Sequence, residues 1–174
     1  RDGAQTQGVD FSVNDKLAIA HALDRVGVDY VEGGWPGANP TDDAFFGAPP
    51  SFKRAKFVAF GMTRRPGRSA ANDPGLNALL NAKTAAVCMV GKSWDFHVDV
   101  ALGISRTENV DMIAESVEHA KQRCGEVMFD AEHFFDGYKA NPQYALDCAL
   151  AAHKAGARWV VLCDTNGGTL PHEI

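Results

Sequence analysis

Residues 84–92 read TAAVCMVGK. Apolar side chains run through this stretch without the polar alternation of a half-exposed strand, so it predicts a β-strand buried on both faces. Further strand-like runs are VDYVEGG (28–34), AKFVAFG (55–61), EVMFDAEHF (126–134) and RWVVLCDTNGG (158–168). Helical patterns alternate with these runs. This order predicts a parallel sheet covered by helices.

Start and stop signals mark the predicted helices. Ser12 and Asp15 fit the S-x-x-D capping pattern, and Gly27 ends the helix that they begin. Asn141, which is followed by a proline, predicts another helix start. The expected buried stripes are Ile19, Ala22, Leu23 and Val26 in the first helix, Ile113, Val117, Ala120 and Cys124 in a later one, and Ala145, Cys148, Ala149 and Ala152 in the last.

Two architectures fit this alternation, a doubly wound sheet and a (β/α)8 barrel. A doubly wound nucleotide binder is typically marked by G-x-G-x-x-G after its first strand, but RDGAQTQG (1–8) is not that motif and GxxxxGK[ST] is absent. Strand ends near water are often polar, but acids and histidines at nearly every end favour the barrel, whose active site forms there. Arg1 and Asp2 are expected to end a first strand. The other polar strand ends are Glu32, Thr63 and Arg64, Lys92, Asp95 and His97, Asp130, Glu132 and His133, and Asp164, Thr165 and Asn166.

Size and composition indicate a globular protein of one domain. The chain has 174 residues, of which 45% are hydrophobic and 22% charged. A net charge of −5 disfavours a general binder of nucleic acid or anionic membranes. No apolar run is long enough to cross a bilayer. The four cysteines form no CxxC pair, which favours reduced thiols in a cytoplasmic protein.

The opening residues carry a more specific signal. RDGAQ (1–5) resembles the RDG-x-Q signature of the DRE-TIM metallolyase superfamily, and VEGGWPGANP, KSWDFHV, FDAEHFFDGYKANP and CDTNGG match its later motifs in order. Ala4, the Gly-Gly-Trp-Pro after Glu32, and Asn166 resemble the citramalate-synthase branch. The resemblance implies an incomplete (β/α)8 barrel. Residues 1–174 would be a partial catalytic domain, from the end of strand one through strand six, without strands seven and eight or a C-terminal regulatory domain.

By this resemblance the protein is a divalent-metal-dependent acyltransferase that joins acetyl-CoA to a 2-oxo acid in leucine or isoleucine biosynthesis. Asp2 would be a metal ligand beside two histidines outside the chain, and this ligand set does not discriminate among Mg²⁺, Mn²⁺ and Zn²⁺. Arg1 would hydrogen-bond the polarised substrate oxygen while paired with Glu32. Gln5 would support the metal site or the substrate, and Thr165 would hydrogen-bond the substrate carboxylate. The resemblance implies a homodimer at full length, without nucleic-acid or membrane partners.

Several residues and functions stay open at this stage. Glu132 and His97 are candidate groups for proton transfer, and His133 and Asn166 are candidate substrate ligands, although Asn166 equally fits a turn. One alternative function is C–C bond cleavage by a lyase of the same superfamily, which would share Arg1, Asp2 and Glu32. The other is an inactive, truncated barrel, and the chain on its own is expected to be inactive. Two roles fit Trp35, Phe45, Phe46 and Trp94, lining the pocket or packing in the core, and packing is favoured.

Overall fold

A computed structural model describes all residues, 1–174, and shows five parallel strands in sequential order. Each strand pairs with the next one along the chain, whereas a doubly wound sheet reverses its strand order. The prediction of five strands in a barrel-like order is confirmed, and the two edge strands are each paired on one side only. The strands are β1 (Tyr30–Gly34), β2 (Lys56–Met62), β3 (Ala86–Lys92), β4 (Glu126–Glu132) and β5 (Trp159–Leu162).

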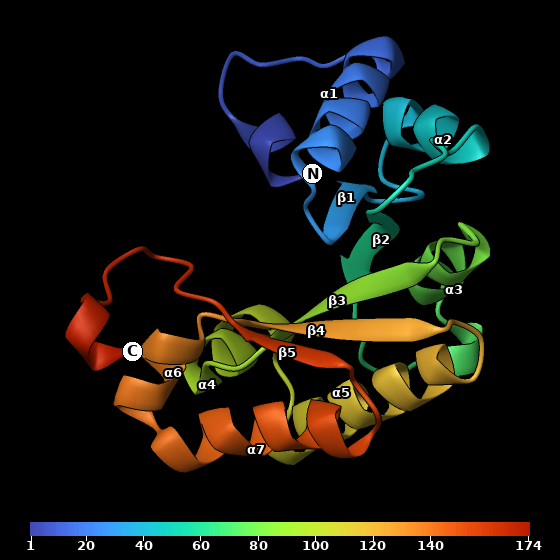
Figure 1. The fold of residues 1–174 in the computed structure, drawn as a ribbon. Coiled ribbons are helices and arrows are strands. Elements are labelled where there is room, and N and C mark those ends of the chain that lie inside the picture. The colour runs from blue at the N-terminus through green and yellow to red at the C-terminus, as the bar shows by residue number, and fades with distance from the viewer.

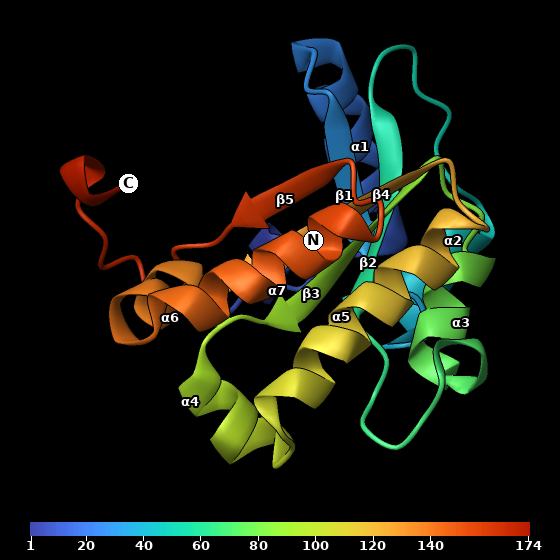
Figure 2. The same cartoon turned by 90° about the horizontal axis from the view of Figure 1, so that it is seen from below.

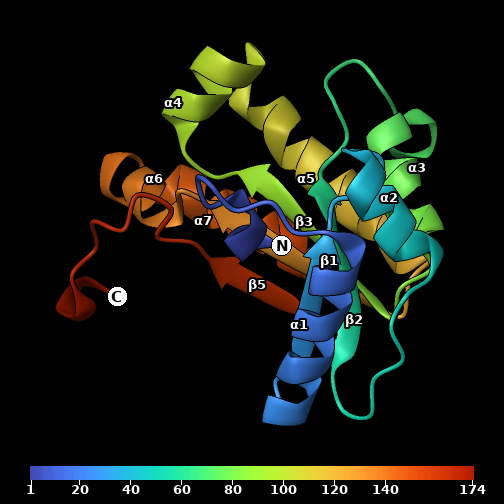
Figure 3. The same cartoon turned by 90° about the horizontal axis from the view of Figure 1, so that it is seen from above.

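Helices connect the strands and lie along the outside of the curved sheet (Figures 1 and 3). The helices are α1 (Val13–Val26), α2 (Pro40–Gly47), α3 (Pro74–Asn81), α4 (Asp95–His97), α5 (Arg106–Lys121), α6 (Phe134–Ala140) and α7 (Pro142–Lys154). Side chains cap the longer ones as predicted: Ser12 forms a capping box with Asp15, and the Asn141 side chain accepts from the backbone N–H of Tyr144. None of the helices is long and apolar enough to span a lipid bilayer.

The apolar strand runs are explained by burial on both faces of the sheet. Along β2, Phe57 and Ala59 face the helices and join the main core, whereas Val58 and Phe60 face the inner side and pack in a second, smaller cluster. A strand with two buried faces needs no polar alternation. Figure 2, seen from below, shows β5 at one edge of the sheet and β1 toward the other.

Arg1 directly precedes a short 3₁₀ helix at Asp2–Gln5, and the Ala4 N–H donates to the Arg1 carbonyl oxygen at 3.1 Å. That Arg1 and Asp2 end a first strand stays a prediction. The predicted buried stripe of α1 is wrong: Ile19, Leu23 and Val26 are 41%, 37% and 77% exposed. The buried face of α1 instead carries Ala20 and Asp24.

Asp24 determines which face of α1 is buried. Its carboxylate accepts from three consecutive backbone N–H groups, those of Lys53, Arg54 and Ala55, at 3.0, 2.9 and 2.8 Å. Of these three hydrogen bonds, the one from the Ala55 N–H contributes most to lowering the pKa of Asp24. A carboxylate that satisfies three orphan donors fixes the rotation of the helix, and spacing of apolar residues alone does not reveal such a contact.

Candidate active site

A cavity of about 520 Å³ opens where the strands end. Arg1 and Asp2 border it on one side, and residues at the carboxyl ends of β3, β4 and β5 border it on the others. Parallel strands bring their carboxyl ends to one edge, which is where barrels place their active sites. The lining residues are Arg1, Asp2, Gln5, Trp35, Phe60, Met62, Val90, Lys92, Asp130, Glu132, Cys163, Asp164 and Thr165.

Arg1 is held by Glu32, as predicted. The Nε of Arg1 donates to Glu32 Oε2 at 2.7 Å, and the backbone nitrogen of Arg1 donates to the Glu32 carbonyl oxygen at 2.9 Å. The guanidinium lies over the Phe60 ring, 3.8 Å from its centroid, and its Nη1 is 3.2 Å from Asp2 Oδ1. Burial acts to lower the pKa of Arg1, but the hydrogen bond and charge of Glu32 outweigh it and raise that pKa. The cation is therefore fixed on three sides beside the cavity.

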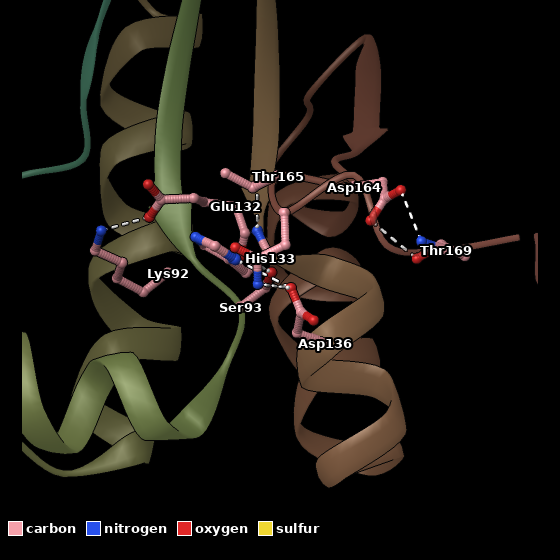
Figure 4. Close-up of polar contacts among 9 residues, drawn as sticks. Lys92, Ser93, Glu132, His133, Asp136, Asp164, Thr165 and Thr169 are labelled. Atoms are coloured by element: carbon pink, nitrogen blue, oxygen red, sulfur yellow. Dashed lines mark hydrogen bonds and ion pairs between the residues drawn. The ribbon is translucent and has the colours of Figure 1, made fainter.

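A second ion pair, Lys92 with Glu132, lies on another wall of the same cavity (Figure 4). The two residues are register partners at the ends of β3 and β4. Their backbones are also fixed: Asn109 donates to the Lys92 carbonyl at 2.8 Å, and the Ser93 hydroxyl donates to the Glu132 carbonyl at 2.7 Å. Glu132 thus faces the cavity with a cation beside it.

Thr165 connects the cavity to a polar network around Asp136 (Figure 4). The His133 backbone N–H donates to Thr165 Oγ1 at 2.9 Å, and His133 itself has a left-handed φ of 53°. The Asp136 carboxylate contacts His133 Nδ1 at 3.0 Å and accepts from the Asn166 amide at 2.9 Å. This network fixes the hydroxyl of Thr165 at the rim of the cavity.

The predicted site residues therefore divide into two groups. Arg1, Asp2, Gln5, Glu132 and Thr165 line the cavity, and Glu32 supports it through Arg1. The remaining three, His97, His133 and Asn166, do not line it.

His97 lies behind the cavity wall, against another ring. Its ring centroid is 4.5 Å from that of His133, edge to face, and 4.8 Å from that of Trp94. Burial, together with the nearby His133, lowers the pKa of His97. Its Nδ1 is buried without a hydrogen-bond partner. His97 is thus packed in a cluster of rings and does not line the cavity.

Three acidic or thiol groups cluster beneath Arg1. Ligand atoms of Glu32, Cys88 and Asp130 all lie within 4.8 Å of one another. Burial, with the charge of Glu32 adding to it, raises the pKa of Asp130, although a hydrogen bond from Cys88 opposes this. Burial also raises the pKa of the Cys88 thiol far above its usual range. Metals bind thiolates, and Glu32 is already engaged by Arg1, so this cluster is poorly suited to a metal.

Asp2 offers a carboxylate that is better suited to bind a metal ion. Its carboxylate is at the edge of the cavity and 84% exposed, apart from its contact with Arg1. A free carboxylate oxygen suits a hard divalent cation, but one ligand does not hold an ion by itself. Asp2 therefore fits a metal site as a single ligand, and Asp2 lies outside the cluster of Glu32, Cys88 and Asp130.

Some lining residues were not among the predicted site residues. The sequence marks Lys92, Asp130 and Asp164 only as polar strand ends. Trp35 has both of the roles considered for it, since it lines the cavity and packs against the smaller core cluster. The strand register would have identified Lys92, because it is the partner of Glu132. Asp164 serves as a turn former, since it accepts from the N–H and hydroxyl of Thr169 at 3.0 and 2.9 Å.

A sequential parallel sheet with its functional groups at the carboxyl edge defines part of a (β/α)8-barrel active site. The family model described as HMGL-like matches residues 1–174, and the chain belongs to this family.

Curated relatives agree with this family assignment. The chain is 57% identical to (R)-citramalate synthase of Aquifex aeolicus, over all of this chain and 33% of that protein. It is 30% identical to 2-isopropylmalate synthase of Streptococcus gallolyticus, over 99% of this chain and 32% of that protein. The chain thus spans about a third of the length of these curated relatives.

Solved structures show the same fold. Hydroxymethylglutaryl-CoA lyase from Pseudomonas aeruginosa superposes with a TM-score of 0.75 at 19% identity, over 97% of this chain and 56% of that chain. At this identity the likeness establishes the fold, a portion of a (β/α)8 barrel.

Proposed function

We propose that the chain is part of the catalytic barrel of an acyltransferase that joins acetyl-CoA to a 2-oxo acid, with citramalate synthesis from pyruvate as the first activity to test. The main support is the similarity to (R)-citramalate synthase along the whole chain, at 57% identity. The cavity agrees with it, since two fixed cations, Arg1 and Lys92, and the Glu132 carboxylate face one space at the barrel's carboxyl edge. The protein would act in the cytoplasm, as a dimer at full length.

The 2-oxo acid would bind between Arg1 and Thr165. Arg1 can donate hydrogen bonds to the ketone oxygen as negative charge develops there, and it needs little reorganisation because Glu32 already orients it. The Thr165 hydroxyl lines the cavity and suits a carboxylate oxygen of the substrate. Asp2 would give one ligand to a divalent ion, with further ligands from outside this chain. Such an ion polarises a chelated carbonyl.

Glu132 is the best placed group for proton transfer. In the condensation, a base removes a proton from the acetyl methyl group and the resulting carbon attacks the ketone carbon. The ketone oxygen then takes up a proton, and hydrolysis of the thioester releases CoA. Glu132 faces the cavity and has Lys92 beside it, whereas His97 does not reach the cavity. We assign Glu132 the role of base, with Lys92 holding its carboxylate in place.

The test is to incubate the full-length gene product with acetyl-CoA, pyruvate and Mn²⁺ and to measure free CoA together with the C–C condensation product. Release of CoA that depends on pyruvate is the expected result. Other 2-oxo acids, including branched ones, define the preferred substrate. If no 2-oxo acid elicits CoA release, but a hydroxyacyl-CoA is cleaved to acetyl-CoA, the protein is a lyase and the synthase assignment is wrong.

A further inference from the structure

The loop that follows β2 carries two cations without ion-pair partners. At the carboxyl edge of the sheet, other basic side chains are paired with carboxylates: Arg1, Lys16, Arg64, Lys92 and Arg106. Arg65 and Arg68 are exposed and make no ion pair. Two free guanidinium groups three residues apart, in a chain of net charge −5, form a local positive site beside the cavity.

The backbone of this loop is preorganised. The N–H of Arg68 donates to the Arg65 carbonyl at 3.3 Å, and Gly67 between them has a φ of 72°. Pro66 followed by a left-handed glycine is the pattern of a type II turn, with the two arginines at its ends. The N–H of Arg65 also donates to the buried carboxylate of Asp73 at 3.0 Å. The two arginines therefore stand on a turn whose backbone is fixed at both ends.

A second cavity, of about 130 Å³, lies under the loop and adjoins the reaction cavity. Arg65 and Pro66 line it on the loop side. On the other side it shares lining residues with the reaction cavity, among them the Lys92–Glu132 pair and Trp35. A ligand could thus contact the exposed turn at one end and the reacting groups at the other.

We propose that Arg65 and Arg68 bind the phosphate groups of the acyl-CoA substrate, while its pantetheine arm runs through the cavity under the loop to the Lys92–Glu132 pair. This inference rests on the proposed function. An acyl-CoA carries its reactive thioester and its phosphates at opposite ends of a long, uncharged arm, which matches an unpaired basic turn joined by a cavity to the reaction site. Guanidinium groups suit phosphate because their planar forks donate two hydrogen bonds at once.

The experiment compares two substrates and two double variants in the full-length gene product. S-acetylpantetheine carries the thioester without any phosphate, so it reports on the reaction site alone. Arg65→Gln with Arg68→Gln removes the proposed contacts. The matched control is Arg25→Gln with Arg158→Gln, because Arg25 ends α1 and Arg158 precedes β5, at the opposite edge of the sheet.

We expect the ratio of kcat/KM for acetyl-CoA to that for S-acetylpantetheine to fall about tenfold in the Arg65/Arg68 variant. The loss of two exposed ion pairs between arginine and phosphate accounts for a change of this size. The KM for the 2-oxo acid should stay the same, and the control should match the wild type. Added salt should weaken acetyl-CoA binding in the wild type more than in the variant. An unchanged ratio, or an equal loss with both substrates, overturns the inference.

Direct binding keeps this inference separate from the proposed function. CoA is titrated into the wild type and both variants by isothermal titration calorimetry, which needs no turnover. Weaker binding in the Arg65/Arg68 variant alone supports the phosphate contacts even if no 2-oxo acid is condensed. Equal CoA affinity in all three proteins, or no CoA binding to the wild type, overturns the inference whatever the reaction is.

Discussion

Replacing Gly137 by alanine should destabilise the fold, because α6 touches the loop after β3 at this residue. An alanine Cβ would lie 2.4 Å from the Ser93 carbonyl oxygen and 2.9 Å from Trp94 Cα. Reaching even a 3.0 Å contact with that oxygen requires a movement of about 0.6 Å (3.0 − 2.4). Ser93 is fully buried and its hydroxyl is bonded to the Glu132 carbonyl, so its side of the contact is fixed.

The other side of the contact is fixed as well. The carbonyl oxygen of Gly137 accepts from the Asn141 N–H at 2.7 Å, and the Asn141 side chain donates to Asp95 at 3.0 Å. Overpacking in a fixed contact costs up to about 3 kcal/mol, and the better helix propensity of alanine returns about 1 kcal/mol. The net loss of stability is therefore up to about 2 kcal/mol, and kcat should fall because Ser93 positions Glu132.

Melting temperature and urea midpoint of the full-length protein are the measurements for Gly137→Ala. Gly47→Ala is the matched control, since it lies at the end of α2 and an added Cβ meets nothing within 4 Å. The control should be neutral or slightly stabilising. If Gly137→Ala melts at the wild-type temperature, the contact between α6 and the Ser93 loop is not as tight as described.

Three further predictions concern the ion pair, the sheet edges and the histidine cluster. Lys92→Met should lower kcat/KM at least about tenfold, mainly through kcat, because Glu132 loses the cation that holds its carboxylate. Lys92→Arg should restore part of the loss, and an unchanged kcat in Lys92→Met contradicts the pairing role. Residues 1–174 expressed alone should self-associate, because β5 exposes Trp159, Val161 and Leu162 at an unpaired edge, and a monodisperse, cooperatively melting monomer in light scattering contradicts this. Burial lowers the pKa of His97 below its ordinary value of 6.5, so protonation of this ring favours the unfolded state. The stability that the neutral ring allows is present above about pH 6.5 and is lost as the pH falls through the folded-state pKa. Melting temperatures measured against pH should therefore fall less steeply toward acid in His97→Gln, and a variant with the full wild-type acid slope contradicts this role of His97.

The fold could be predicted largely from strand burial. Uninterrupted apolar runs such as residues 84–92 need two covered faces, and parallel strands between helices provide them. The rotation of α1 could not be predicted, because two faces of that helix carry apolar residues. The choice between them depends on the Asp24 carboxylate and the three N–H groups of residues 53–55, which a helical period does not show.

For the candidate site, the sequence predicts the location at one edge of the sheet but not the orientation of each side chain. Polar residues at strand ends indicated that one edge of the sheet gathers polar side chains, and Arg1, Glu132 and Thr165 line one cavity there. Sequence position did not show which side chains of a strand end enter the cavity. His133 follows Glu132 directly, yet its left-handed backbone directs it to Asp136 and away from the cavity.

The two cations of the cavity are each paired with a glutamate, and the raised pKa of Asp130 keeps a further negative charge away from these pairs. Arg1 pairs with Glu32 and Lys92 with Glu132, which leaves Asp130 facing the cavity without a cation of its own. A full charge on Asp130 would compete with Glu32 for Arg1. Burial, reinforced by the charge of Glu32, holds the pKa of Asp130 above its ordinary range and so disfavours that charge. Arg1 therefore stays paired with Glu32, and its Nη2, which takes part in neither the Glu32 nor the Asp2 contact, can donate to a substrate oxygen.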